Sequence, residues 1–404
     1  MRSPVSDYLA EVLEGCAGDT SGANADYIPE LARADSDRFA VAVATLTGYV
    51  HGAGDTDVMF TMQSISKPFV HALALQDRGL PAFLDKIDVE PSGEAFNELS
   101  LEEGTTRPRN PMINAGAITT STLVGEPDST LAHRWERILG GLSAFAGREL
   151  EVDEAVFSSE LETAHRNLAI AHMLRGYDTI TEDPEAVVAN YTRQCSLRVT
   201  TRDLALMAAT LANGGVQPLT GERVVDPPVV REVLSVMTTC GMYDAAGDWV
   251  TRVGIPAKSG VAGGIIGALP GQVGLAVFSP RLDEHGASVR GVRVCERLSQ
   301  EMGMHLMEAP APARSVLRES GVREVDGIGT AHVYALQGML QFAGVEQVLH
   351  DLTEEPPSTP QVVLDLSQVY SVNSVGRRML REAVRRLGLD GLTVHVVDPE
   401  GMLD

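Results

Sequence analysis

The sequence predicts an α/β protein of two domains, and three observations support this fold class. Apolar strand-like runs lie near both ends of residues 1–308, whereas helical patterns fill the middle. A short stretch rich in Ala and Pro, residues 309–317, then interrupts the chain as a linker would. Beyond it, strand-like and helical patterns alternate, which is typical of a small α/β domain. We therefore expect a sheet closed by both ends of the first domain, with a helical cluster inserted between them.

The elements of the first domain follow from hydrophobic patterns and from the residues that end them. A helix predicted at about 7–13 stops at a cluster of Gly and Asp, and residues 38–46 are typical of a buried strand that leads through Gly48 into a second one. A helix predicted from Ser64 ends at Gly79, a plausible glycine C-cap. Further helices are predicted at 131–146, 161–175 and 202–212, strands within 253–278, and a last helix at 288–306.

The second domain, residues 318–404, is predicted from shorter patterns. Strands are expected at 330–336, 362–366 and 392–397, and helices at 344–352 and 375–387. The last of these helices is amphipathic and rich in arginine. Such an alternation predicts a sheet with helices packed against it.

Composition excludes several classes of function. The apolar fraction of 44% allows a sizeable core, and the net charge of −23 argues against nucleic acid or an anionic membrane as a partner, because both need a basic surface. The four scattered cysteines form no C-x-x-C pair, and the N-terminus has no apolar signal run. No stretch is long enough for a transmembrane helix. We therefore expect a soluble, cytoplasmic protein that binds neither a metal nor an organic cofactor.

Lysine is rare in this chain, and this makes its positions informative. Only Lys67, Lys86 and Lys258 occur among 32 basic residues. Arginine stays protonated in proteins, whereas lysine can lose its proton and act as a base. Lys86 lies between two aspartates, and we expect it on a solvated, charge-paired surface. The other two lysines belong to motifs that carry chemistry.

The motif Ser64-Ile65-Ser66-Lys67 is an S-x-x-K sequence at the start of a predicted helix. Residues three apart share one face of a helix, so the Ser64 hydroxyl and the Lys67 amine are expected to meet. A neutral lysine there can take the serine proton and make the serine a nucleophile. A chain of this length with average lysine content would contain about one S-x-x-K motif by chance. With only three lysines in the chain, a chance occurrence is much less frequent.

The second motif, Lys258-Ser259-Gly260, precedes a Gly-rich strand pattern. An S-x-x-K followed much later by K-[ST]-G is the motif order of serine β-lactamases and penicillin-binding proteins. The backbone N–H of Val261 is expected to pair with that of Ser64 as an oxyanion hole. The plainer alternative is that Lys258 is a surface lysine at the start of a strand.

Seven stretches of the first domain occur together in the order of one family. They are residues 25–32, 63–67, 109–118, 159–167, 191–196, 241–244 and 258–261. Together they resemble the bacterial glutaminases, a family that shares the β-lactamase-like serine fold. The resemblance covers about the first three quarters of the chain. It implies hydrolysis of L-glutamine to L-glutamate and ammonia, with Ser64 as the nucleophile and Lys67 as its base.

The resemblance also implies a set of substrate contacts. They are Tyr27, Gln63, Ser64, Asn114, Glu160, Asn167, Tyr191, Tyr243 and Val261. Glu160 is the expected partner of the α-ammonium, because a desolvated cation needs a compensating charge. Asn114, Asn167 and a tyrosine hydroxyl are expected to donate hydrogen bonds to the α-carboxylate. Tyr243, preferred over Tyr191, would relay a proton to the departing ammonia.

Each of these residues has a structural alternative. Asn114 could only cap a turn, Glu160 could only be a first-turn residue favoured by a helix dipole, and Tyr27 could be a core aromatic. The rival function is a penicillin-recognising or β-lactamase-like binding protein without glutaminase activity. The S-D-N motif of β-lactamases is absent, as is the G-x-S-x-G of α/β-hydrolases. His165 and His172 lack the acidic third ligand of a zinc site.

Three stretches near the C-terminal end carry a second resemblance. Residues 340–345, 362–367 and 372–376 resemble the STAS domain shared by anti-sigma-factor antagonists and sulphate-transporter tails. Ser374 is the possible regulatory site, although Asn373 stands where that family usually has Asp. We expect this domain to bind a regulatory protein or a partner subunit. We also expect the chain to form a homo-oligomer, a dimer or a tetramer.

Overall fold

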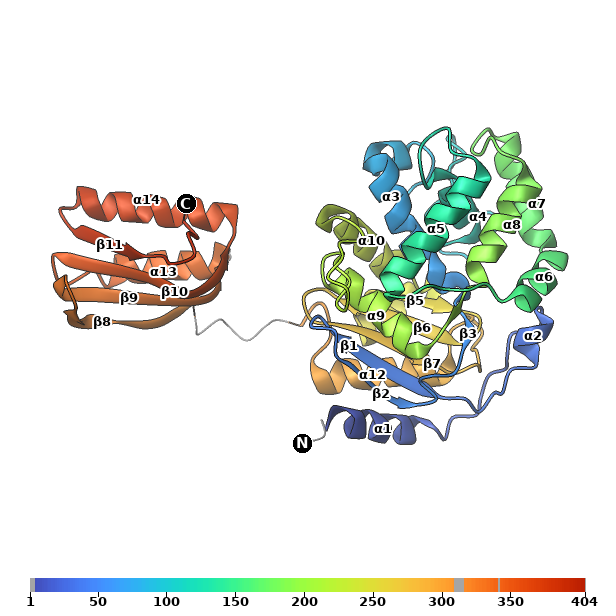
Figure 1. Ribbon diagram of the computed structural model, residues 1–404, viewed down its shortest axis with the longest axis horizontal. Coiled ribbons are helices and arrows are strands. Elements are labelled where there is room, and N and C mark those ends of the chain that lie inside the picture. Colours follow the sequence, from blue (N-terminus) through green and yellow to red (C-terminus); the bar gives the residue numbers. More distant parts are fainter. Residues whose placement is uncertain (1–3, 309–315, 341, 404) are drawn as a thin grey trace. The chain divides into compact units, whose positions relative to one another are not determined.

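The computed structural model describes residues 4–308, 316–340 and 342–403, and the chain divides into two compact units, Met1–Glu308 and Ala309–Asp404. Figure 1 shows a mixed sheet-and-helix fold in each unit, which confirms the predicted α/β class. Most of the expected linker, residues 309–315, lies outside the described residues. Leu317, the last residue assigned to that linker, already belongs to strand β8 (Leu317–Val325).

The first unit is built on a five-stranded antiparallel sheet with the order β2-β1-β7-β6-β5. The N-terminal strands are β1 (Ala40–Thr45) and β2 (Val50–Gly54). The strands from the other end of the unit are β5 (Ala257–Gly260), β6 (Gly264–Leu269) and β7 (Val273–Phe278). Because β1 pairs with β7, both ends of the unit meet in the middle of the sheet, as predicted.

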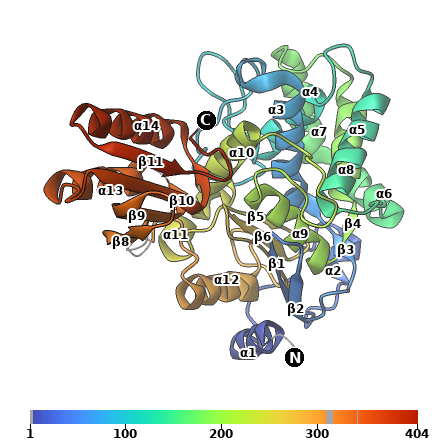
Figure 2. The same ribbon diagram turned by 60° about the vertical axis from the view of Figure 1, so that its left-hand side comes forward.

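Alternation along β1 places helices on both faces of this sheet. Val41 and Val43 face a core shared with α1 (Val5–Cys16) and α12 (Val289–Met302), whereas Ala42 and Ala44 face the core of α9 (Thr201–Ala212). Figure 2 shows α12 and α9 on opposite sides of the strands. The strand β7 approaches α9 so closely that a Cβ at Gly274 would lie 2.1 Å from the Ala209 nitrogen.

A helical cluster packs above α9, around the buried first half of α3 (Ser66–Leu84). Its other long helices are α4 (Asn114–Leu123), α5 (Leu131–Ala146), α6 (Glu154–Glu162), α7 (His165–Gly176), α8 (Pro184–Cys195) and α10 (Pro227–Cys240). The shorter elements are α2 (Pro29–Ala32), α11 (Ala246–Arg252), the 3-10 turns η1 (Gln63–Ile65) and η2 (Tyr243–Ala245), and the strand pair β3 (Phe60–Thr61) and β4 (Arg198–Val199). The inserted cluster confirms the predicted helical middle.

Two predicted helices differ in detail from the observed ones. The helix expected at 161–175 is two helices, because Thr163 ends α6 with its hydroxyl bonded to the carbonyls of Ser159 and Glu160. The helix expected from Ser64 begins with the 3-10 turn η1 instead. Gly79 does end its first segment, at φ +74°, but a second segment continues to Leu84.

The second unit has a four-stranded sheet with the order β11-β10-β9-β8. Strand β10 (Gln361–Val372) runs parallel to β9 (Gly329–Leu340) and to β11 (Thr393–Val397), and β8 is antiparallel to β9. The helices are α13 (Phe342–Glu354) and α14 (Ser374–Leu389), and residues such as Val348 and Leu380 join the sheet in one core.

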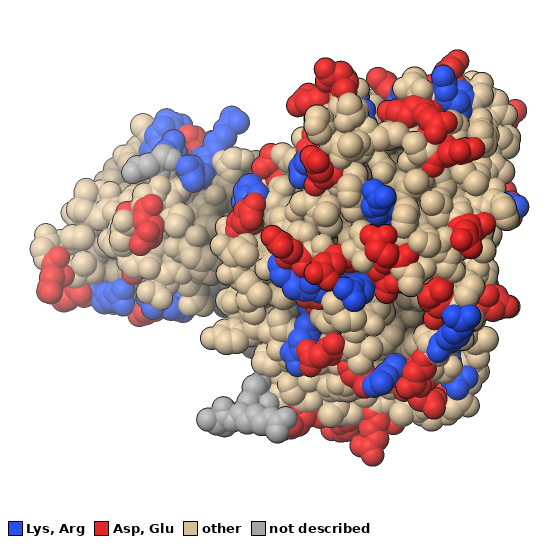
Figure 3. All heavy atoms as spheres, turned by 45° about the vertical axis from the view of Figure 1, so that its right-hand side comes forward, with Lys and Arg blue, Asp and Glu red and all other residues tan. Residues whose placement is uncertain are grey.

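Acidic side chains are spread over the surface of the first unit. Figure 3 shows Asp and Glu distributed across the visible face, with Lys and Arg interspersed among them. This pattern accords with the net charge of −23. Within the described residues, none of the helices combines the length and the apolar character needed to cross a membrane.

Candidate active site

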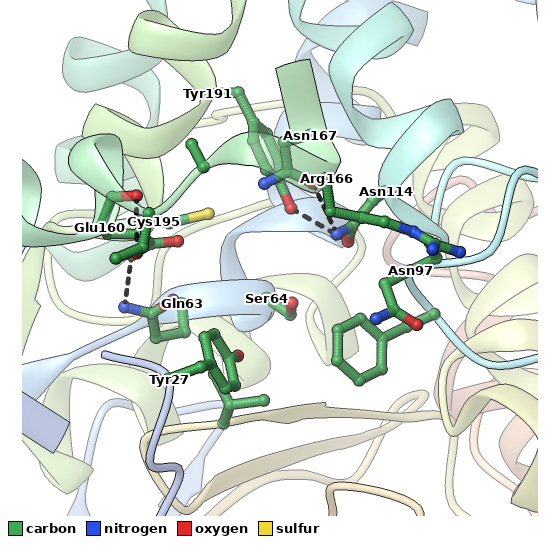
Figure 4. A pocket seen from close by; sticks show the side chains of 14 residues that line it. Tyr27, Gln63, Ser64, Asn97, Asn114, Glu160, Arg166, Asn167, Tyr191 and Cys195 are labelled. Atoms are coloured by element: carbon green, nitrogen blue, oxygen red, sulfur yellow. Dashed lines mark hydrogen bonds between the residues drawn. The ribbon is translucent and has the colours of Figure 1, made fainter. Parts of the chain in front are cut away.

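A pocket of about 350 Å³ lies in the first unit, where the sheet edge meets the helical cluster. Eight of the nine predicted substrate contacts line it, namely Tyr27, Gln63, Ser64, Asn114, Glu160, Asn167, Tyr191 and Val261. Figure 4 shows Glu160 and Gln63 on one side of Ser64, and Asn97 and Arg166 on the other. The ninth, Tyr243, reaches Lys67 with its hydroxyl.

The turn that carries Ser64 has an unusual backbone. Gln63 has a φ of +50°, a conformation that residues other than glycine rarely adopt and that clusters at functional sites. Ser64 is buried, and it is the middle residue of η1, two positions before the start of α3. Strand β5 packs closely on this turn, because a Cβ at Gly260 would lie 3.0 Å from the Met62 carbonyl oxygen. The glycine of the K-S-G motif therefore allows β5 to pack closely on the turn that carries Ser64.

Lys67 is fully buried beneath Ser64. Its Nζ donates to Asn114 Oδ1 at 2.8 Å and to the Tyr243 hydroxyl at 3.3 Å. Burial lowers the pKa of Lys67 to about 7, because the charged ammonium is poorly solvated there. The lysine is therefore poised to be neutral near physiological pH.

The contact between Ser64 and Lys67 is indirect. Among the described residues, no hydrogen bond joins these two side chains, although the S-x-x-K spacing predicts one. The Tyr243 hydroxyl accepts from Lys67 at 3.3 Å, and it lies close enough to Ser64 for that side chain to lower the pKa of the phenol against the larger effect of burial. Burial raises the pKa of Tyr243 well above its usual value, so the phenol keeps its proton and can pass one on. Tyr243 thus lies between the expected nucleophile and the expected base.

Lys258 is the second buried lysine of the site. Its Nζ donates to the Ser259 carbonyl at 2.7 Å and lies 3.8 Å from the centroid of the Tyr243 ring. Burial, and then the charge of Lys67, lower the pKa of Lys258 well below its usual value. The alternative of a surface lysine is therefore wrong. Lys86 differs from its expectation too, because it is half-buried and donates to the Asp178 carbonyl.

Glu160 is the only carboxylate among the described residues that line the pocket. Its Oε2 accepts from Gln63 Nε2 at 3.1 Å. Burial raises the pKa of Glu160 to about 7, opposed by that hydrogen bond and by the charge of Lys67. Glu160 lies near the C-terminal end of α6, where a helix dipole disfavours a carboxylate. The alternative of a first-turn residue is therefore wrong.

The other structural alternatives also fail. Asn114 is the first residue of α4, and its side chain accepts from Lys67 and donates to Asn167 Oδ1 at 2.9 Å instead of capping a turn. The Tyr191 hydroxyl also donates to Asn114 Oδ1, at 3.4 Å. Tyr27 is 50% exposed at the mouth of the pocket, so it is no core aromatic.

Sequence reasoning missed several residues that line the pocket. Cys195 lies one helical turn after Tyr191 on α8, a spacing from which it could have been found. Burial raises the pKa of its thiol to about 12, so it stays protonated. Arg166 forms an ion pair with Glu98 at 2.7 Å and donates to the Asn97 carbonyl. Among the described residues, no three His, Cys, Asp or Glu side chains are grouped to hold a metal ion.

Comparisons with known proteins identify the family of each unit. The glutaminase family model matches residues 22–307, and the STAS domain model matches residues 322–404. The glutaminase of Corynebacterium glutamicum is 50% identical over 405 residues, which cover 100% of this chain and 96% of that protein.

Solved structures give the same result. The structure of Mglu in its glutamate form has 45% identity and a TM-score of 0.90, and all of both chains is covered. The structure of the probable glutaminase ybaS has 40% identity and a TM-score of 0.71, covering 75% of this chain and 99% of that one. The family match to the first unit, the match to the STAS domain and the full-length relatives together show that this chain belongs to the glutaminase family.

Proposed function

We propose that this chain hydrolyses L-glutamine to L-glutamate and ammonia through a γ-glutamyl ester on Ser64. The observation that carries the proposal is a buried Lys67, bonded to the Tyr243 hydroxyl, three residues after the Ser64 that lines the pocket. Family membership and the full-length relatives named glutaminase support the overall activity. The residue roles below are inferred from the contacts and charges of the site.

In the first half-reaction, the Ser64 hydroxyl attacks the side-chain amide carbon of glutamine. Its proton passes through the Tyr243 hydroxyl to neutral Lys67, which burial keeps available as a base. Negative charge then develops on the amide oxygen, where the N–H groups of Ser64 and Val261 would stabilise it. The same proton returns to the amide nitrogen, the C–N bond breaks, and ammonia leaves an ester on Ser64.

The second half-reaction uses the same groups in the same way. A water molecule gives its proton through Tyr243 to Lys67 and attacks the ester carbon. The proton then returns to Ser64 Oγ as the ester bond breaks, and L-glutamate is released. Lys258 would support both steps by packing its amine against the Tyr243 ring. Its own pKa is lowered by burial and by the charge of Lys67, so it adds no second positive charge to the site.

The substrate would be recognised by one charged side chain, a carboxylate, and by several uncharged hydrogen-bond donors. The α-ammonium pairs with Glu160, which becomes fully ionised when a cation enters beside it. The α-carboxylate receives hydrogen bonds from Asn167 and Tyr27. The bond from Asn114 Nδ2 to Asn167 Oδ1 orients that amide so that its Nδ2 remains able to donate.

One assay distinguishes this proposal from the rival one, a penicillin-recognising binding protein. Ammonia release from L-glutamine and ring opening of a β-lactam are measured on the same purified sample. We expect ammonia release that disappears in Ser64→Ala, with no β-lactam turnover. Binding or turnover of a β-lactam without ammonia release would overturn the glutaminase proposal.

The second unit is proposed to serve regulation or assembly. Ser374 is exposed in the first turn of α14, and the Asn373 side chain caps that helix by accepting from the Gly376 N–H at 2.6 Å. Asn and Asp are equally good helix caps, so Asn373 preserves the start of the helix without the charge of Asp. The boundary at about residue 308 and the homo-oligomer stay predictions, which limited proteolysis and light scattering would test.

A further inference from the structure

Tyr243 has a backbone conformation that its own turn does little to stabilise. Its φ is +56°, in the left-handed region where the Cβ of a bulky residue crowds the backbone. The turn η2 is a single 3-10 turn, held by bonds from Ala245 N to the Met242 carbonyl and from Ala246 N to the Tyr243 carbonyl. Such a conformation persists only where surrounding contacts hold it.

The next residue, Asp244, makes such a contact outside the turn. Its Oδ2 lies 3.0 Å from Nδ1 of His285, in the loop that precedes α12. The hydrogen bond with Asp244, and then the charges of Asp244, Asp283 and Glu284, raise the pKa of His285. Among the described residues, these three carboxylates are the charged groups that act on the imidazole. The pair joins the Tyr243 turn to a segment 41 residues further along the chain.

The loop that presents His285 is internally closed. One carboxylate oxygen of Asp283 accepts from the N–H groups of His285 and Ala287, each at 2.9 Å. The Asp283 N–H in turn donates to the Ala287 carbonyl at 2.8 Å. Leu282 exchanges two backbone hydrogen bonds with Ala23, which lies in the segment that leads to Tyr27. His285 is therefore presented from a well-anchored turn.

The same loop also approaches Tyr243 from a second direction. The rings of Phe96 and Tyr243 lie 5.4 Å apart between centroids. A Cβ on Gly286 would be 3.7 Å from Phe96, which is ordinary van der Waals contact. The turn at 283–287 thus contacts the Tyr243 turn through Asp244, and its backbone also lies near Phe96, the ring neighbour of Tyr243.

We propose that His285 is a positioning residue for the reaction, which holds the Tyr243 turn through Asp244 so that the Tyr243 hydroxyl meets both Ser64 and Lys67. The inference rests on the role proposed for Tyr243. His285 does not line the pocket, so its loss should lower kcat and leave KM for glutamine nearly unchanged. The side chains of His285 and Asp244 are 40% and 36% exposed. Loss of an ion pair with that exposure is expected to lower kcat about two- to fivefold.

The test is a double-mutant cycle in the full-length chain. Initial rates of ammonia release give kcat and KM for the wild type, His285→Gln, Asp244→Asn and the double variant. We expect kcat to fall about two- to fivefold in each single variant and no further in the double one, because both remove the same pair. His285→Arg, which keeps a positively charged donor toward Asp244, should recover much of the kcat that the neutral glutamine loses. His133→Gln, at an exposed position on α5, is the matched control and should behave as wild type.

Several results would overturn the inference. They are an unchanged kcat in His285→Gln, additive losses in the double variant, or a change confined to KM. A loss that follows only the fraction of folded protein, measured by thermal unfolding, would show a purely structural role. Failure of the proposed function looks different, because the wild type would then release no ammonia, or Tyr243→Phe would keep full activity.

Discussion

Replacing Lys67 by Arg tests the proposed base directly, because the change keeps a positive charge and removes the capacity to accept a proton. Arginine remains protonated in proteins, even in buried sites. Lys67 is fully buried and donates to Asn114 and Tyr243. The larger guanidinium can keep one of these hydrogen bonds, so the loss of activity should exceed the loss of stability.

The magnitude follows from the pKa of Lys67. Burial lowers it from 10.5 to about 7, which increases the neutral fraction at neutral pH roughly a thousandfold. Arginine at this position would have almost no neutral fraction. General-base catalysis typically contributes about 100- to 10,000-fold, so kcat/KM should fall by about that factor.

The assay is steady-state ammonia release from L-glutamine, with a matched control and a test of folding. Lys86→Arg makes the same exchange at a half-buried lysine remote from the pocket lining, and it should keep wild-type activity. Thermal unfolding and binding of L-glutamate would show that the Lys67→Arg protein is folded and retains its pocket. Activity within a few-fold of the wild type would refute the assignment of Lys67 as the general base.

The remaining predictions concern recognition, pH, the second unit and salt. Glu160→Gln should weaken binding of glutamine by tenfold or more, because the carboxylate pairs with the α-ammonium. The same change should have much less effect on an analogue without the α-amine. An equal rise in KM for both substrates would contradict this role of Glu160. The competent forms are neutral Lys67 and ionised Glu160, both populated above about pH 7, so kcat/KM should fall as pH drops below about 7, and a flat profile would refute this. A chain truncated after Glu308 should keep ammonia release, since no residue of the pocket lies beyond that point in the described chain, and a folded but inactive truncation would show that the second unit completes the site. Activity should be maintained or rise with added NaCl, because salt screens repulsion among the acidic groups, and a steep loss in a moderate salt series would contradict this.

Much of the fold could be predicted from local patterns. The apolar run that became β1 and the paired runs that became β6 and β7 have the composition of buried strands, and the helix at 131–146 was predicted with its observed bounds. Other elements carry weaker signals. The helices α4, α8 and α10 were not predicted, and neither was β8, whose burial pattern is mostly exposed. An exposed edge strand has little hydrophobic alternation, so periodicity cannot reveal it.

The candidate reacting groups of the site could be predicted from the sequence itself. The spacing of the motifs around Ser64 and Lys258 predicts the nucleophile and its base, because it decides which neighbouring side chains share a face of a helix or strand. The resemblance to the bacterial glutaminases adds Tyr243 to these candidates. Tertiary structure decided how those groups act. It brought the Tyr243 hydroxyl to the Lys67 amine, and it buried both lysines against one tyrosine ring. The pKa of a lysine depends on solvent access and on charges brought close from distant parts of the chain, and only packing sets these.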